Sequence, residues 1–115
     1  MRFDYSSEKK GDICIFRLQG RLLEKSESDN LMSEFELALE SKCQKFIVNM
    51  NEIEYMNSSG LNLLIRMLTK ARNSYGELVL CQLSDRIQNL LVATKLQSIF
   101  NVEGTEAEAI EKLKS

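Results

Sequence analysis

The chain has 115 residues, a formal net charge of -2 and 43% hydrophobic residues, with no histidine. This length fits one domain, and the composition is that of a soluble globular protein, which excludes a disordered or low-complexity chain. The near-neutral charge without a basic stripe argues against nucleic-acid binding, and the apolar runs are far shorter than the roughly 20 residues that cross a bilayer.

Two β-like segments open the chain, residues 1–8 and 12–20, and Lys9-Lys10-Gly11 between them predicts a hairpin-like turn. The side chains of the second segment alternate between two faces, one with Cys14, Phe16 and Leu18 and the other with Ile13, Ile15 and Arg17. From about residue 28 to 41, the apolar residues recur with the period of an amphipathic helix.

The segments 45–50 and 77–83 are short, nearly continuous apolar runs, which is typical of central strands covered on both faces. Between them, residues 58–74 place apolar side chains at helical spacing, and a turn that contains glycine follows. A strand, a helix and a strand in this order predict a parallel pair of strands.

Farther along, Ser84 is a candidate cap for a third helix, and residues 97–102 are a candidate edge strand. Thr105, with Glu108 three residues later, predicts the start of a tail helix. We therefore predict an α/β fold for a single domain, residues 1–115. It has a mixed sheet of four or five strands, with helices packed mainly on one face and the terminal helix elsewhere.

The composition also limits the catalytic and metal-binding chemistry that the chain can support. Without histidine, the serine–histidine and cysteine–histidine nucleophile systems are excluded. Cys14, Cys43 and Cys81 are widely spaced, with no CxxC pair, which disfavours a zinc site and a disulfide framework, and we interpret them as small buried hydrophobic residues. No GxxxxGK[ST] loop is present, so we expect neither an enzyme nor a metal or cofactor.

The junction Asn57-Ser58-Ser59-Gly60 connects the first central strand to the helix that follows it. Asn57 or Ser58 can accept a hydrogen bond from the unpaired backbone N–H groups of the first turn, so each is a candidate N-cap. An exposed serine here is also a candidate phosphorylation site, because a helix amino terminus accommodates the phosphate charge of about -1.5 to -2. The two interpretations are compatible.

The string IVNMNEIEYMNSSGLNLLIRMLTKAR resembles the central signature of the STAS domain, in particular that of the bacterial anti-sigma factor antagonists. FRLQGRL and GELVLCQLSDRIQNLLVATKLQSIFNV resemble further elements of that family, so the resemblance covers nearly the whole chain and implies a STAS-like fold. It also implies a function. In the family, the unphosphorylated antagonist binds an anti-sigma factor that is itself a serine kinase, phosphorylation breaks the complex, and a phosphatase restores it.

Residue by residue, the resemblance implies that Ser58 is phosphorylated and that Ser59 is the second hydroxyl position. The expected partner-binding residues are Met56, Asn57, Ser58, Ser59, Gly60, Asn62 and Arg66. Among the methionines, we expect only Met56 to be exposed. The expected partners are an anti-sigma factor/serine kinase and a cognate phosphatase. The protein itself is expected to be cytoplasmic, without membrane insertion, and a monomer or weak dimer.

Two positions depart from the family pattern. Asn57 stands where the family usually has Asp, and Leu23 stands where a second Asp lies near the phosphorylated serine. Both changes remove a carboxylate from the neighbourhood of Ser58. They favour an alternative, in which the chain is a constitutive STAS scaffold subunit of a larger complex, such as a lipid-transport ABC system or a stress-signalling assembly, without phosphorylation.

Overall fold

The computed structural model describes residues 2–22 and 28–114, and Leu23 therefore lies outside the described residues. In chain order, the elements are β1 (Asp4–Lys10), β2 (Ile13–Leu22), α1 (Asp29–Glu40), β3 (Lys45–Met56), α2 (Ser58–Asn73), β4 (Glu77–Cys81), α3 (Asp85–Ala93), β5 (Asn101–Glu103) and α4 (Glu106–Lys114).

These strands form one sheet of five strands in the order β1-β2-β3-β4-β5. β1 and β2 are antiparallel and are connected by a turn at Gly11 and Asp12, where Gly11 has a φ of +62° that favours glycine. The neighbouring pairs from β2 to β5 are all parallel. The mixed sheet, the hairpin and the parallel pair around α2 are therefore confirmed.

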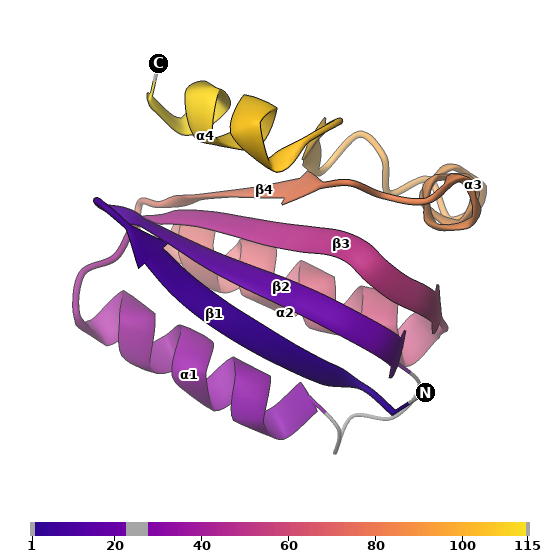
Figure 1. Ribbon diagram of the computed structural model, residues 1–115, viewed down its shortest axis with the longest axis horizontal. Coiled ribbons are helices and arrows are strands. Elements are labelled where there is room, and N and C mark those ends of the chain that lie inside the picture. Colours follow the sequence, from indigo (N-terminus) through magenta and orange to yellow (C-terminus); the bar gives the residue numbers. More distant parts are fainter. Residues whose placement is uncertain (1, 23–27, 115) are drawn as a thin grey trace.

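The helices cover the two faces of the sheet unequally (Figure 1). α1, α2 and α3 contribute to the larger hydrophobic cluster on one face, and α4 packs on the other face through Ala109 and Leu113. The alternation in β2 is also confirmed, because Phe16 and Leu18 belong to the larger cluster and Ile15 to the smaller one.

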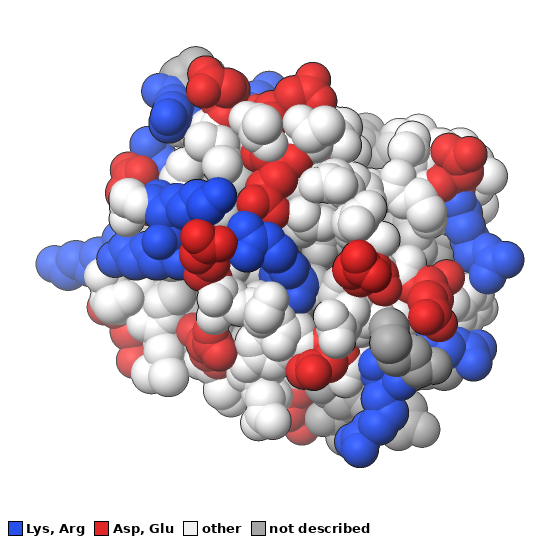
Figure 2. Space-filling model, in the orientation of Figure 1, with Lys and Arg blue, Asp and Glu red and all other residues white. Residues whose placement is uncertain are grey.

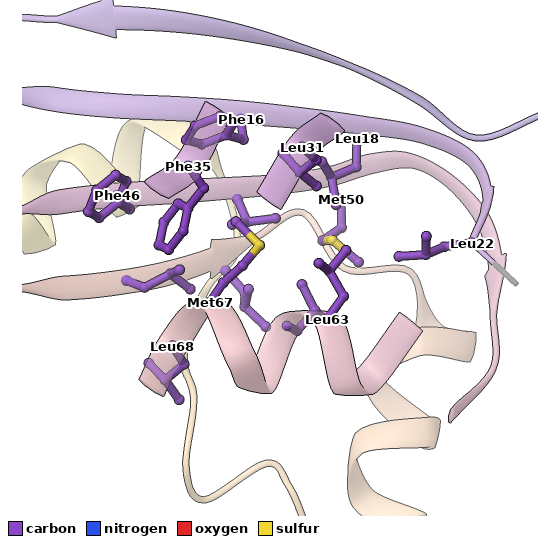
Figure 3. Packing of buried hydrophobic residues seen from close by; sticks show 14 of the residues in the cluster. Phe16, Leu18, Leu22, Leu31, Phe35, Phe46, Met50, Leu63, Met67 and Leu68 are labelled. Carbon is purple, nitrogen blue, oxygen red and sulfur yellow. The ribbon is translucent and has the colours of Figure 1, made fainter. Parts of the chain in front are cut away.

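The larger core contains an aromatic centre next to a methionine-rich region (Figure 3). Phe35 packs on Phe46 with ring centroids 4.6 Å apart, and Phe16 lies 6.0 Å from Phe35. Met50 and Met67 are fully buried farther along the same core. Unbranched methionine fills irregular gaps between a twisted sheet and two helices, which agrees with their interpretation as core residues.

β3 is longer than the sequence pattern indicates. The predicted strand ended at Met50, but the strand continues to Met56 and pairs with the end of β2. Two register shifts in this pairing each add a residue to β3, so the buried side chains Met50, Ile53 and Met56 are spaced three residues apart. Strand prediction from sequence relies on a two-residue alternation of buried and exposed side chains, so this three-residue spacing does not indicate a strand.

Candidate functional site

The candidate site lies where β2 and β3 end and α2 begins. Asn57 follows the last residue of β3, and its backbone N–H donates to the carbonyl oxygen of Leu22, the last residue of β2, at 3.4 Å. Loops at the carboxyl ends of parallel strands are held by the rigid sheet while they stay open to partners. The first turn of α2 is therefore fixed in place at an accessible edge.

Asn57 is the N-cap of α2. Its backbone is extended, and its side-chain Oδ1 accepts hydrogen bonds from the N–H groups of Ser59 at 3.0 Å and Gly60 at 3.3 Å. Two of the unpaired donors at the helix start are satisfied in this way. Of the two cap candidates in the sequence, the structure selects Asn57.

Ser58 is the first residue of α2 and is exposed, whereas Ser59 is half-buried. Since Asn57 caps the helix, the Ser58 hydroxyl is not needed for that role. The first turn of α2 contains no acidic residue, so an anion on Ser58 would meet the positive end of the helix dipole without a carboxylate in that turn.

Gly60 allows α2 to approach the strand ends closely. A Cβ atom at this position would lie 2.8 Å from the Cβ of Met56 and 3.2 Å from the carbonyl oxygen of Leu22. Both distances are shorter than ordinary van der Waals contact, so only glycine fits without displacing the helix start. Gly60 is buried and positions the site; it does not offer a surface to a partner.

Met56 corrects one expectation. It was expected to be an exposed contact residue, but its side chain is 1% exposed and belongs to the larger core. The two register shifts in β3 place Met56 on the same face as Met50 and Ile53, inside the larger core. Met56 therefore packs against the first turn of α2 from the side of the larger core.

Ser58, Asn62 and Arg66 are exposed and follow each other at intervals of four residues, so they share one outward stripe of α2. Lys70, one turn farther on, instead leans toward α1 and pairs with Glu36 at 3.1 Å. The structure thus brings three of the predicted contact residues together on the outward face.

A cluster beside the junction was missed by sequence reasoning. The Tyr55 side chain is 37% exposed, and the guanidinium groups of Arg21 and Arg86 lie 5.9 and 6.0 Å from its ring centre. Three elements, β2, β3 and α3, meet here. Each cation–aromatic contact at an exposed position contributes about 0.5–1 kcal/mol, and the cluster adds two positive charges near the start of α2. Tyr55, an aromatic residue two positions before Asn57, is the member of the cluster that the sequence could have indicated.

A network of charged hydrogen bonds lies on the face of the sheet that α4 covers. The carboxylate of Glu106, at the start of α4, accepts from Arg17 at 2.7 and 3.0 Å and from Asn49 at 2.7 Å. The hydrogen bond from Arg17 is the main cause that holds the pKa of Glu106 below its ordinary value, and the same contact raises the pKa of Arg17. In Figure 2, cationic side chains gather near the hairpin of β1 and β2, where Arg17 also pairs with Glu8 at 2.8 Å. This network attaches α4 to the sheet.

Within residues 2–22 and 28–114, no three histidine, cysteine or acidic side chains form a group that could hold a metal ion. In the same ranges, no helix is long and apolar enough to cross a membrane. The junction offers a hydroxyl and an amide cap, and Tyr55, which has two arginine neighbours, is close by in the chain. This set of groups is suited to binding and to accepting a modification.

The architecture defines the chain as an α/β protein of the STAS type. The family model described as STAS domain matches residues 4–109, and the chain belongs to this family. The relatives that match include the anti-sigma F factor antagonist of Paenibacillus polymyxa, which is 23% identical over 114 residues, with 98% of this chain and 97% of that protein covered. The anti-sigma-B factor antagonist of Staphylococcus aureus (strain NCTC 8325) is 39% identical over 62 residues, with 53% of this chain and 57% of that protein covered.

Solved structures share the fold along nearly the whole chain. A crystal structure from Thermotoga maritima matches with a TM-score of 0.85 at 20% identity and covers 96% of this chain and 95% of that chain. The Bacillus anti-sigma factor antagonist SpoIIAA matches in its unphosphorylated form with a TM-score of 0.78 at 19% identity, covering 97% and 99% of the two chains. The phosphorylated form of SpoIIAA matches with a TM-score of 0.75 at 20% identity, covering 95% and 98%.

Proposed function

We propose that this chain is an anti-sigma factor antagonist that works as a protein-binding switch within a single STAS domain. Unphosphorylated, it binds an anti-sigma factor that is also a serine kinase; phosphorylation of Ser58 releases the partner, and a phosphatase restores binding. The relatives are named anti-sigma factor antagonists, which supports the binding role, and the matching SpoIIAA structures include a phosphorylated form, which supports the switch. A cytoplasmic location and a monomer or weak dimer complete the proposal.

The observation that carries the proposal is the division of roles between Asn57 and Ser58. Asn57 accepts both cap hydrogen bonds, so the exposed Ser58 hydroxyl is open to a kinase without loss of the cap. A phosphate would add about -1.5 to -2 charges to the stripe formed with Asn62 and Arg66. A partner fitted to the uncharged Ser58 hydroxyl would then meet a large, charged and strongly hydrated group, which opposes close contact.

The test is a calorimetric titration of the protein into its cognate anti-sigma factor. Ser58→Asp is expected to weaken binding at least tenfold, whereas Ser58→Ala binds near the wild-type level. Ser59→Ala is the matched control at the neighbouring half-buried hydroxyl. Equal affinities for Ser58→Asp and Ser58→Ala would remove the switch while leaving the binding role intact.

A kinase assay tests the chemistry separately. After incubation with the anti-sigma factor and ATP, mass spectrometry is expected to find phosphate on Ser58, and Ser58→Ala is expected to stay unmodified. Phosphate found only on Ser59, or on neither serine, would contradict the assignment.

One observation favours the alternative, a constitutive scaffold subunit without phosphorylation. Asn57 replaces the usual Asp of the family and still accepts both cap hydrogen bonds, so the contact surface is already shaped without phosphoryl chemistry. Recovery of the unmodified protein in a stable complex with a transporter ATPase would select this function. A complex with a kinase-like anti-sigma factor that ATP dissolves would reject it.

A further inference from the structure

Two of the three cysteines lie next to each other. Cys14 is in β2 and Cys43 lies between α1 and β3, and their Sγ atoms are 2.7 Å apart. Both are free thiols. The third, Cys81, is fully buried in the smaller cluster on the other face of the sheet, whereas Cys14 packs against the larger one. The sheet thus separates a close pair from a single thiol.

The two thiols of the pair differ in access. Cys43 is only 7% exposed, whereas Cys14 is half-buried and lines a pocket of about 210 Å³ between β1 and α1. Lys9, Glu34 and Ala38 also line this pocket. A small molecule can therefore reach Cys14 from solvent, whereas Cys43 is shielded from solvent.

We infer that Cys14 and Cys43 form a reversible dithiol–disulfide pair that responds to hydroperoxides. The Cys14 thiolate attacks an oxygen of the hydroperoxide, the O–O bond breaks, and an alcohol or water leaves, giving a sulfenic acid on Cys14. The Cys43 sulfur then attacks the Cys14 sulfur, the S–O bond breaks, and water leaves with the Cys43 proton. Two thiols and one hydroperoxide become one disulfide, one alcohol and one water; a dithiol reductant reverses the change.

The geometry suits the second step. A disulfide has a bond length of about 2.05 Å, so the sulfur atoms have to approach each other by only about 0.7 Å. Because the Cys43 sulfur already lies beside the Cys14 sulfur, it intercepts the sulfenic acid before a second peroxide oxidises it further.

The surroundings of Cys14 determine how sensitive the cysteine pair is to peroxide. Burial, followed by the hydrogen bond with Cys43, raises the pKa of Cys14 to about 12, and Lys9 opposes this shift. Little thiolate is present at neutral pH, so the first step is slow and the pair stays reduced until the peroxide level is high. The third thiol has no comparable route to solvent and no thiol partner on its face within the described residues.

The bridge would act away from the Ser58 site. It would connect the start of β2 to the segment before β3 and enclose α1 in a covalent loop, whereas Ser58 lies at the opposite, carboxyl ends of these strands. This inference is independent of the proposed function. It can be tested without the anti-sigma factor, so the two can fail separately.

The experiment treats the folded, reduced protein with hydrogen peroxide, counts thiols and maps the linked peptides by mass spectrometry. The thiol count is expected to fall from three to one, with a single link between Cys14 and Cys43, and dithiothreitol is expected to restore all three. Cys81→Ser is the matched control, and it is expected to form the same link.

Four results would overturn the inference. One is the persistence of all thiols at peroxide levels that oxidise a small dithiol; another is a link that includes Cys81. The third is sulfinic acid on Cys14 while Cys43 stays reduced. A thermal scan adds an independent readout, because a bridge across the native loop raises the Tm by roughly 10 °C. A lower Tm after oxidation would show that the link forms only in a distorted chain and would also overturn it.

Discussion

Replacing Asn57 with alanine tests the contact on which the candidate site depends. The substitution removes the acceptor of two hydrogen bonds, from the N–H groups of Ser59 at 3.0 Å and Gly60 at 3.3 Å. Loss of an N-cap costs about 1 kcal/mol, within a range of roughly 0.5–2. For 115 residues the entropy of unfolding is about 0.24 kcal/mol/K, so the Tm is expected to fall by ~4 °C.

Two matched variants separate the cap from general effects of the substitution. Asn57→Asp keeps the oxygen acceptor and adds a negative charge at the positive end of the helix dipole, which contributes about 0.3–1 kcal/mol and raises the Tm by ~1–4 °C. Asn62→Ala removes an exposed asparagine one turn farther on, where alanine favours the helix, so the Tm is expected to stay the same or rise slightly.

Thermal and urea unfolding, followed by circular dichroism, measure all three variants. The reasoning is refuted if Asn57→Ala melts within about 1 °C of the wild type, since the cap then contributes nothing measurable. It is equally refuted if Asn57→Asp is destabilised as much as Asn57→Ala, because an oxygen acceptor would then be irrelevant.

The neighbouring residues give further predictions. Gly60→Ala should destabilise the fold by about 1–2 kcal/mol in urea unfolding, because its Cβ meets Met56 and Leu22; stability above wild type would contradict this packing. Met56→Ala should lower the free energy of unfolding by about 2–5 kcal/mol, as expected for a buried core residue. A decrease below about 0.5 kcal/mol, which is typical of a surface position, would contradict the burial of Met56. Arg17 lowers the pKa of Glu106 in the folded state. The pair therefore stabilises the fold above about pH 4.3, the pKa of Glu106 in the unfolded chain, and this stabilisation is lost as the pH falls through the lower pKa of Glu106 in the folded state. Glu106→Gln should flatten this acid loss in unfolding measured from pH 6 to 2, and an identical pH profile would contradict the linkage.

Much of the fold could be predicted because its signals are local. The helix starts at Ser84 and Thr105 follow from side-chain oxygens that accept from nearby backbone N–H groups, at 3.2 Å for Ser84 and 3.1 Å for Thr105. The alternation of β2 likewise indicates which side chains face each layer of helices. Such contacts lie within a few residues, so sequence order is enough to find them.

The errors arise where distant segments meet. The last six residues of β3 pair with β2 only through two bulges in β3, and no pattern within 51–56 shows this. The same tertiary pairing buries Met56. The position of Arg86 beside Tyr55 depends on where α3 returns to the sheet, and the contact of Cys14 with Cys43 depends on the register of β2 against β3.

The division of roles between Asn57 and Ser58 also explains how a charge could be added to this helix without unfolding it. If Ser58 were the cap, phosphorylation would alter the acceptor that holds the first turn, and modification would change both folding and surface. Because the Asn57 side chain holds that turn, Ser58→Ala should unfold within about 0.5 kcal/mol of the wild type. Ser58→Asp should be as stable as the wild type or more stable by up to about 1 kcal/mol, because its carboxylate lies at the positive end of the helix dipole, and only this variant loses the partner. A large loss of stability in Ser58→Asp would instead show that the switch acts by melting the start of α2. Measuring stability and affinity on the same two variants therefore distinguishes a surface switch from a folding switch.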